Sequence, residues 1–582
     1  MLFKISHHAE KLRDRLLPRA ADLPVDADAA DFQPAALFAF TFVFYVAFLL
    51  CTQSAFILGG EMWAEMATNY FVNANGVTLV QQLLSTDAGY VPLPQRLVGI
   101  VCTLLKLPAA AIPFVYTWTA IFGSAAMIGA FCLRPFRAII RSDGLRFLTC
   151  IATLIVVDFA TRTFINFTYF AAFLVAIVTA LALVDTKRNI PRWAWVLPIL
   201  MASKPAVLAA FPLMLVAALF STARFRKIVL VICLLCVAQV VQMLVSHEGG
   251  AFTTTQHVTL AERLIASAKY FIGFLGSYAG GTLLPQEFFH PLWLGAALAM
   301  FSLWLILRRK VASNALLIAG AALLFFNMVL NCFALSDTWN MDMQVVVGQP
   351  IYRHLIVGFQ GVLLIIAALC DRLLPRVSID IGAFRAPLCA LLFASWFTGV
   401  GWFDRGTQLS GIPKSPTLDN SSWSSMAGAI DAGGAVCVPI DPIGWIYGRD
   451  CSLLNQDVGF PIRPLEFKPM QGDGSTSVAD LPVLKLDGNH VLLALAVLVR
   501  PAQSQEIHVP IKAVITLSDG TTRHLNGARR VSYRGGLVLL TGEGEIPLES
   551  IRSVQIAADG VMQLGFVSDA NPKFPAVLWM GR

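Results

Sequence analysis

The chain has 582 residues, of which 57% are hydrophobic and 14% are charged, and its mean hydropathy is +0.68. An ordinary soluble domain carries about 25% charged residues. The composition therefore excludes a chain made only of ordinary soluble domains. The net charge of +7 comes without a basic patch interleaved with aromatic residues, which disfavours a nucleic-acid partner. The apolar residues form repeated runs of roughly 17–25 residues, the length that crosses a bilayer as a helix. We therefore expect a polytopic α-helical membrane protein with room for one further domain.

The basic residues predict the orientation of the helices. Residues 1–33 are charged and lack an early apolar core, so they indicate a cytoplasmic tail rather than a cleavable signal peptide. Lys and Arg also cluster in short loops between apolar runs, as the positive-inside rule requires. The first span, about 34–57, then runs outward and places the loop 58–96 outside.

Ten further passages follow within residues 34–403, which gives about eleven in total. The Gly-rich segment 268–284 is expected to be re-entrant or interfacial, because a span there would place Arg308–Lys310 outside. The expected passages are about 109–133, 145–160, 164–184, a hairpin of two short segments over 193–220 that turns at Lys204-Pro205, 228–245, 292–307, 315–335, 355–369 and 387–403.

From Asp404 onward the chain changes character, with frequent Gly, Pro, Ser and Asp. Short apolar alternations appear, separated by turn sequences such as LSDGTT and TGEGE; the alternations are HVLLALAVLV, EIHVPIKAVITL, GLVLLTG, SVQIAA and VMQLGFV. This pattern predicts an antiparallel β-sandwich over residues 404–582. The domain follows an outward span, so we expect it on the same side of the membrane as the loop 58–96.

The cysteines predict one disulfide and no metal centre. Most of the 11 lie in apolar runs, where a thiol behaves as a small core residue. Cys437 and Cys451 are the only two in the polar C-terminal region, and their spacing would close a short disulfide in an oxidising compartment. No pair of CxxC motifs is present, so no metal ligands are assigned. A divalent cation is compatible with the loop carboxylates, but no spacing demands one.

The loop 58–96 concentrates carboxylates in a chain that has few charges. Charged groups at membrane depth are costly and usually functional, and a carboxylate can take the proton from an acceptor hydroxyl. Glu61, Glu65 and Asp87 are therefore the candidate catalytic residues. The structural alternatives are that the two glutamates, four residues apart, form the wet face of a surface helix, and that Asp87 is a turn former.

Cations on the outer loops are candidates for binding a phosphate. Lys and Arg can neutralise a departing phosphate, and Arg can do so with two parallel hydrogen bonds. The candidate residues are Arg96, Lys204, Tyr352, Arg353 and His354. Lys204 could instead anchor its hairpin at the interface, and Arg353 could be a snorkelling residue at the end of a span. Asp158 and Arg162 are four residues apart and favour a structural helix pair.

Four segments resemble the GT-C superfamily of polytopic glycosyltransferases. They are GGEMWAEM with Glu61, DAGYVPLPQR with Asp87, the ASKP turn with Lys204, and IYRH before a late span. The resemblance covers about the first 400 residues in topology. Glu61 is followed by Met62 rather than by a second acid, so the base stays open between Glu61, Glu65 and Asp87.

The resemblance implies a hexosyl- or pentosyltransferase in the bacterial inner membrane. Its donor would be a polyprenyl-phosphate-linked sugar and its acceptor a cell-envelope glycan or a lipid-linked glycan, used on the periplasmic side. By analogy, the C-terminal β domain is similar to the carbohydrate-binding appendages of some such enzymes.

Two other functions fit the sequence less well. A non-enzymatic transporter or flippase of lipid-linked sugars would line a path through the membrane with charges. The charges here gather at one face, and no internal repeat is visible. A membrane acyltransferase would need a histidine deep in a reaction chamber, whereas the histidines lie in the outer loops and the N-terminal tail.

Overall fold

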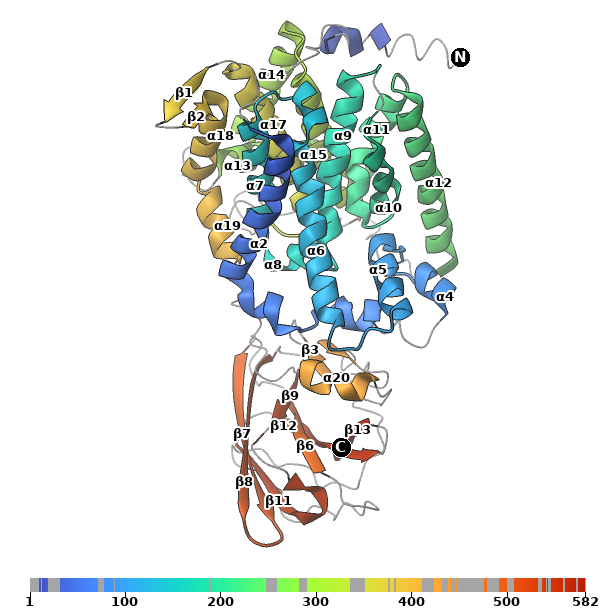
Figure 1. Ribbon diagram of the computed structural model, residues 1–582, viewed down its shortest axis with the longest axis vertical. Coiled ribbons are helices and arrows are strands. Elements are labelled where there is room, and N and C mark those ends of the chain that lie inside the picture. Colours follow the sequence, from blue (N-terminus) through green and yellow to red (C-terminus); the bar gives the residue numbers. More distant parts are fainter. Residues whose placement is uncertain are drawn as a thin grey trace. The chain divides into compact units, whose positions relative to one another are not determined.

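The computed structural model describes the chain in two compact units (Figure 1). The first unit comprises Met1–Gln53, Leu83–Val98 and Trp118–Pro413, and the second comprises Ser54–Gln82, Gly99–Thr117 and Lys414–Arg582. The described residues are 10–11, 13–18, 32–71, 78–87, 89–187, 190–246, 259–281, 290–334, 351–374, 377–381, 384–410, 423–431, 438–440, 445–447, 476–478, 491–499, 507–531, 536–540, 542, 546–557, 561–571 and 574–580. Cys437 and Cys451 lie outside them, so their disulfide stays a prediction.

Seven helices among the described residues are long and apolar enough to cross a membrane, judged by length and composition. They are α2 (Pro34–Gly59), α6 (Ile112–Gly129, continued by a short 3₁₀ turn to Cys132), α9 (Ala171–Val184, preceded by the 3₁₀ turn Phe167–Phe170), α12 (Ala223–Ser246), α14 (Pro291–Arg308), α15 (Asn314–Ala334) and α17 (Ile356–Leu373). Each coincides with a predicted span, which confirms the multi-pass character read from the apolar runs.

Other predicted passages are shorter helices. The segment 193–220 is divided, as expected, at Lys204-Pro205: α10 (Leu197–Met201) ends before the break and a 3₁₀ helix, Pro205–Ala210, begins after it and leads into α11 (Phe211–Ala218). Pro205 suits the first turn of a helix because its missing N–H is not needed there. Within the other predicted passages, the short helices include α7 (Asp143–Ile155), α8 (Phe159–Arg162), α18 (Leu388–Gly399) and α19 (Trp402–Ser410). Two more, α4 (Leu79–Leu84) and α5 (Leu93–Leu104), lie between α2 and α6 in the chain.

Residues 268–280 of the segment expected to be re-entrant belong to one uninterrupted helix, α13 (Leu260–Gly280). The helix begins earlier than predicted because Thr259 and Glu262 form a reciprocal capping box at its N-terminus. It packs closely on α14, since Gly276 and Gly295 bring the two backbones together: a Cβ on Gly295 would lie 1.8 Å from the Ile272 carbonyl oxygen. Small residues allow this approach between membrane helices.

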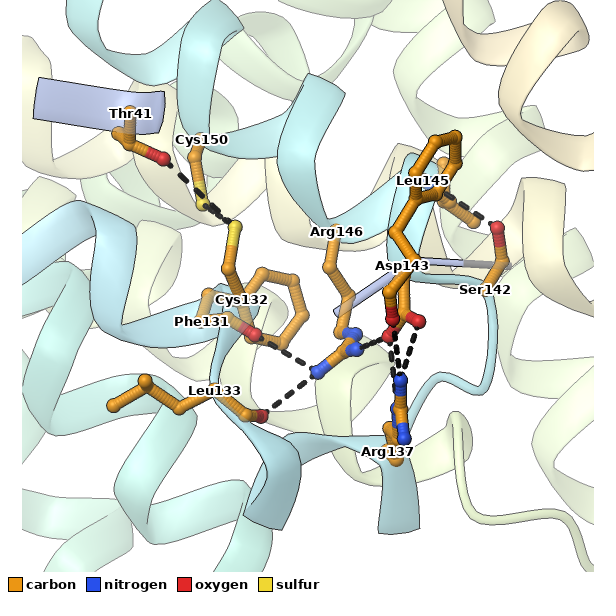
Figure 2. Close-up of polar contacts among 11 residues, drawn as sticks. Thr41, Phe131, Cys132, Leu133, Arg137, Ser142, Asp143, Leu145, Arg146 and Cys150 are labelled. Atoms are coloured by element: carbon orange, nitrogen blue, oxygen red, sulfur yellow. Dashed lines mark hydrogen bonds and ion pairs between the residues drawn. The ribbon is translucent and has the colours of Figure 1, made fainter. Parts of the chain in front are cut away.

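A buried ion-pair network ties the end of α6 to α7 (Figure 2). Asp143 is fully buried and pairs with both Arg146 and Arg137, whose Nη2 lies 2.6 Å from its Oδ2. The Arg146 guanidinium also donates to the carbonyl oxygens of Phe131 and Leu133, at 3.1 and 2.9 Å. The sequence analysis did not predict this network.

The second unit contains the strands from β3 onward, and their pairings are antiparallel. One sheet has the order β10 (Ile546–Pro547), β6 (Val491–Val499), β12 (Val561–Asn571), β13 (Phe574–Met580), with β9 (Gly536–Leu540) also paired to β6. Another has the order β5 (Thr476–Val478), β11 (Ile551–Ala557), β7 (Ile507–Leu517), β8 (Thr522–Val531). Two strands, β3 (Val438–Ile440) and β4 (Trp445–Tyr447), form a separate hairpin. All five predicted alternations are confirmed as strands.

Strands that the sequence analysis did not predict include β8 and the pair formed by β1 and β2. The strand β8, TRHLNGARRV, lacks regular apolar alternation, but it pairs with β7 through a turn at Asp519-Gly520, where Gly520 has φ +84°. In the first unit, β1 (Ser378–Ile381) and β2 (Phe384–Pro387) form a hairpin where a plain inner loop was expected.

The contact between α13 and α14 supports a stability prediction. Gly295→Ala forces the backbones apart and should lower the free energy of unfolding by about 1–3 kcal/mol, the usual cost of overpacking. Titration of the micelle-embedded protein with a denaturing detergent measures it. Gly399→Ala is the matched control, because a Cβ there meets nothing within 4 Å. Equal stability of the two variants would contradict the close packing.

Candidate functional site

Lys204 is a buried cation at the break between α10 and Pro205. Lys204 is only 6% exposed, and its Nζ donates to the Tyr90 hydroxyl at 2.5 Å. The same nitrogen lies 3.6 Å from Asp87 Oδ2 and 5.2 Å from the centroid of the Tyr90 ring. A buried charge is costly unless it is paired. Lys204, Asp87 and Tyr90 therefore form one polar group, here named the Lys204 cluster.

The loop that carries Asp87 and Tyr90 is a tight turn. The Asp87 N–H donates to the Tyr90 carbonyl at 2.7 Å, the Tyr90 N–H donates back at 3.3 Å, and Gly89 between them has φ +85°. The Tyr90 hydroxyl also lies 3.4 Å from Asp87 Oδ2. Asp87 is thus a turn residue, as the structural alternative held, and its carboxylate also faces Lys204.

Three anchors hold this turn in the first unit. Arg96 is 3% exposed and donates through Nε to the Ser85 carbonyl at 2.9 Å and through Nη2 to the Thr86 carbonyl at 3.1 Å. Gln239 of α12 forms two hydrogen bonds with the backbone of Val91. The third is the N–H of Leu93, which donates to the Ala202 carbonyl at 2.9 Å. The Arg96 guanidinium, predicted to bind phosphate, is engaged with backbone carbonyls of the turn.

A cavity of about 150 Å³ adjoins the Lys204 cluster. Its polar lining residues are Tyr90, Ser203, Lys204 and Gln239. The other lining residues are apolar or thiol side chains from α10, the following 3₁₀ helix and α12: Met201, Ala202, Pro205, Leu208, Ile232, Leu235, Cys236 and Val240. The arrangement suits a molecule with one anionic group and an apolar chain.

The IYRH segment lies within electrostatic reach of Lys204. Burial, together with the charges of Arg353 and Lys204, lowers the pKa of His354 to about 4. Arg353 is exposed, and its Nε donates to His354 Nε2 at 3.3 Å. The ring of Tyr352 is edge-on to that of His354, and burial raises the pKa of Tyr352. Lys204 and Arg353, which are 149 positions apart in the sequence, thus both act electrostatically on His354.

Asp158 and Arg162 have separate local contacts near this segment. Asp158 caps α8 by accepting from the Thr161 N–H at 3.0 Å, and its own N–H donates to the Ile351 carbonyl at 3.3 Å. Arg162 is buried and donates to the Ile155 carbonyl at 2.8 Å. Each residue therefore has a structural contact of its own, and these contacts are to the backbone rather than to the other member of the predicted pair.

Glu61 belongs to the second unit and contacts the start of α20 (Trp423–Asp431). It is 6% exposed, and one carboxylate oxygen accepts from the Trp423 N–H at 2.9 Å. A negative charge is favourable at a helix N-terminus. At the other end of α20, Asp431 accepts from the Ala109 N–H at 2.8 Å. Glu65 is half-buried in the same unit. The three candidate bases therefore lie in two different units.

Two residues of the site escaped the sequence reading. Tyr90 lies inside the DAGYVPLPQR segment, in which only the charged residues Asp87 and Arg96 are predicted to have a role. Gln239 interrupts the apolar run of α12, and Gln242 does so again three residues later. Amides inside an expected span are unusual and seek partners, which was the available signal.

His354 supports a pH prediction. An unfolded histidine titrates near 6.5 and His354 near 4, so the unfolded chain binds more protons between these values. Stability should therefore fall as the pH drops from about 6.5 toward 4. At pH 5 the loss is on the order of 2 kcal/mol. The free energies of unfolding of wild type and His354→Gln, compared at pH 7 and pH 5, isolate the contribution of His354 to this pH dependence. An equal pH dependence in both proteins would show that His354 is not buried in its neutral form.

Comparison of the chain with known protein families, with curated proteins and with solved structures finds no match. What the site can do therefore follows from its own side chains. A buried amine paired with a carboxylate beside an apolar cavity can bind an anionic amphiphile and can accept a proton next to it.

Proposed function

We propose that this chain is a membrane glycosyltransferase that takes its sugar from a polyprenyl-phosphate-linked donor. The observation that supports the proposal is the Lys204 cluster beside an apolar cavity. A polyprenyl phosphate combines a charged phosphate with an apolar chain, and the site combines a cation with apolar walls. The acceptor would be a cell-envelope glycan or glycolipid, used at the periplasmic face of a bacterial inner membrane.

In this proposal Lys204 binds the donor phosphate and Asp87 is the general base. The acceptor hydroxyl attacks the anomeric carbon and gives its proton to Asp87, while the bond from that carbon to the phosphate oxygen breaks. The leaving polyprenyl phosphate then carries the additional negative charge, which Lys204 stabilises. Without donor, Lys204 and Asp87 neutralise each other at 3.6 Å. Donor phosphate would draw the amine toward itself and leave the carboxylate available.

The other candidate residues have supporting roles. Arg353 is exposed and shares its electrostatic surroundings with Lys204, so it can approach the phosphate from the solvent side. Arg96 holds the backbone of the Asp87 turn. The contact of Glu61 with the N-terminus of α20 favours a structural role for Glu61, and it favours Asp87 as the base.

The assignment of the base is tested by two isosteric variants. Asp87→Asn removes the proton acceptor and should lower transfer by at least about 100-fold, the usual contribution of a general base. Glu61→Gln retains an oxygen that can accept from Trp423, so it should keep transfer within about threefold. Transfer of radiolabelled sugar from a polyprenyl-phosphate donor measures both. The opposite ranking would make Glu61 the base.

The phosphate site is tested by binding. Lys204→Met should weaken farnesyl phosphate binding at least tenfold, about 1.4 kcal/mol, because the cation is lost and the apolar volume is kept. Since a lone Asp87 would then be buried without its partner, Lys204→Met/Asp87→Asn is the folding control. Farnesol, which lacks the phosphate, should bind wild type and Lys204→Met equally. Unchanged phosphate binding would overturn the site, whereas binding without any transfer would favour a transporter or flippase.

A further inference from the structure

We infer that Gln239 is a positioning residue that holds the Asp87 turn against the wall of the cavity. This inference rests on the proposed function, because it assigns Asp87 to the reaction. The Val91 N–H donates to Gln239 Oε1 at 2.8 Å, and Gln239 Nε2 donates to the Val91 carbonyl at 2.7 Å. One side-chain amide thus satisfies both polar groups of a residue that follows Tyr90 directly. Such a two-point contact defines orientation as well as distance.

The same face of α12 forms one wall of the cavity. Ile232, Leu235, Cys236 and Gln239 recur at the spacing that places side chains on one side of a helix, and all four line the cavity. The opposite side of α12 carries large exposed apolar residues: Leu230, Leu234, Val237, Val241 and Leu244. Gln239 therefore contacts the Asp87 turn from the same face of α12 that the apolar chain of a bound ligand would touch.

The turn bridges two walls of the cavity. On one side, Tyr90 contacts Lys204 and the Leu93 N–H contacts the Ala202 carbonyl, both at the break after α10. On the other side, Val91 is tied to α12 through Gln239. The position of Asp87 relative to Lys204 therefore depends on both ties. Loss of the Gln239 tie should free the turn on one side while leaving Lys204 and the apolar walls in place.

The variant Gln239→Leu separates positioning from binding. It removes both hydrogen bonds, keeps a similar volume and leaves an apolar wall. We expect kcat to fall at least tenfold, while KM for the donor and the Kd for farnesyl phosphate change less than about threefold. Gln242→Leu is the matched control, one turn along the same helix, because Gln242 contributes only a 3.4 Å hydrogen bond to the Leu84 carbonyl. It should leave kcat within twofold.

Hydrogen exchange gives a readout that does not require activity. The amide of Val91 should exchange at least tenfold faster in Gln239→Leu than in wild type, and at the wild-type rate in Gln242→Leu. Unchanged exchange, or equal effects of the two variants, would overturn the positioning role even if the protein proved to be a transporter. Faster exchange with an unchanged kcat in an active enzyme would also overturn it. Absence of transfer in wild type, with the expected exchange pattern, would instead refute only the proposed reaction.

Discussion

The cost of burying the Lys204 amine is the constraint on which the candidate site depends. At 6% exposure the ammonium group has lost most of its water, and a charge in that position must find partners within the protein. The tyrosine hydroxyl and the carboxylate of the Asp87 turn supply them. The break in the 193–220 segment positions Lys204, and hydrogen bonds from Arg96 and Gln239 hold the Asp87 turn opposite it. Each of these contacts therefore helps to offset the cost of burying the Lys204 charge.

The network around Asp143 meets the same constraint in a different setting. There the carboxylate and the Arg146 guanidinium are both fully buried, and backbone carbonyls at the end of α6 accept further hydrogen bonds. That network joins two helices inside the fold. The Lys204 cluster instead adjoins a cavity, and its carboxylate sits on a loop. An ion pair beside open volume can exchange one partner for a ligand, which is the physical basis for assigning chemistry to it.

The two strongest carboxylate candidates differ in their partners rather than in their burial. Glu61 and Asp87 are 6% and 8% exposed. Glu61 accepts from a backbone N–H at the start of a helix, a contact that stabilises the ionised form and the helix together. Asp87 is paired with an amine whose own position can respond to a ligand. The role of each acid therefore depends on the group opposite it, which the loop sequence alone does not specify.

The sequence by itself determined the elements that depend on local patterns. Seven helices long enough to cross a membrane followed from the length of apolar runs, and five strands followed from period-two alternation. Both patterns are local, because desolvation of the backbone and of side chains acts within each segment. It also located the break at Lys204-Pro205. The strand β8 was missed because it exists through its pairing with β7, and the start of α13 was missed because its capping box lies outside the apolar run. The site was decided only by the tertiary structure, since Asp87, Lys204, Gln239 and His354 are brought close by packing. No periodicity relates residues so far apart along the chain.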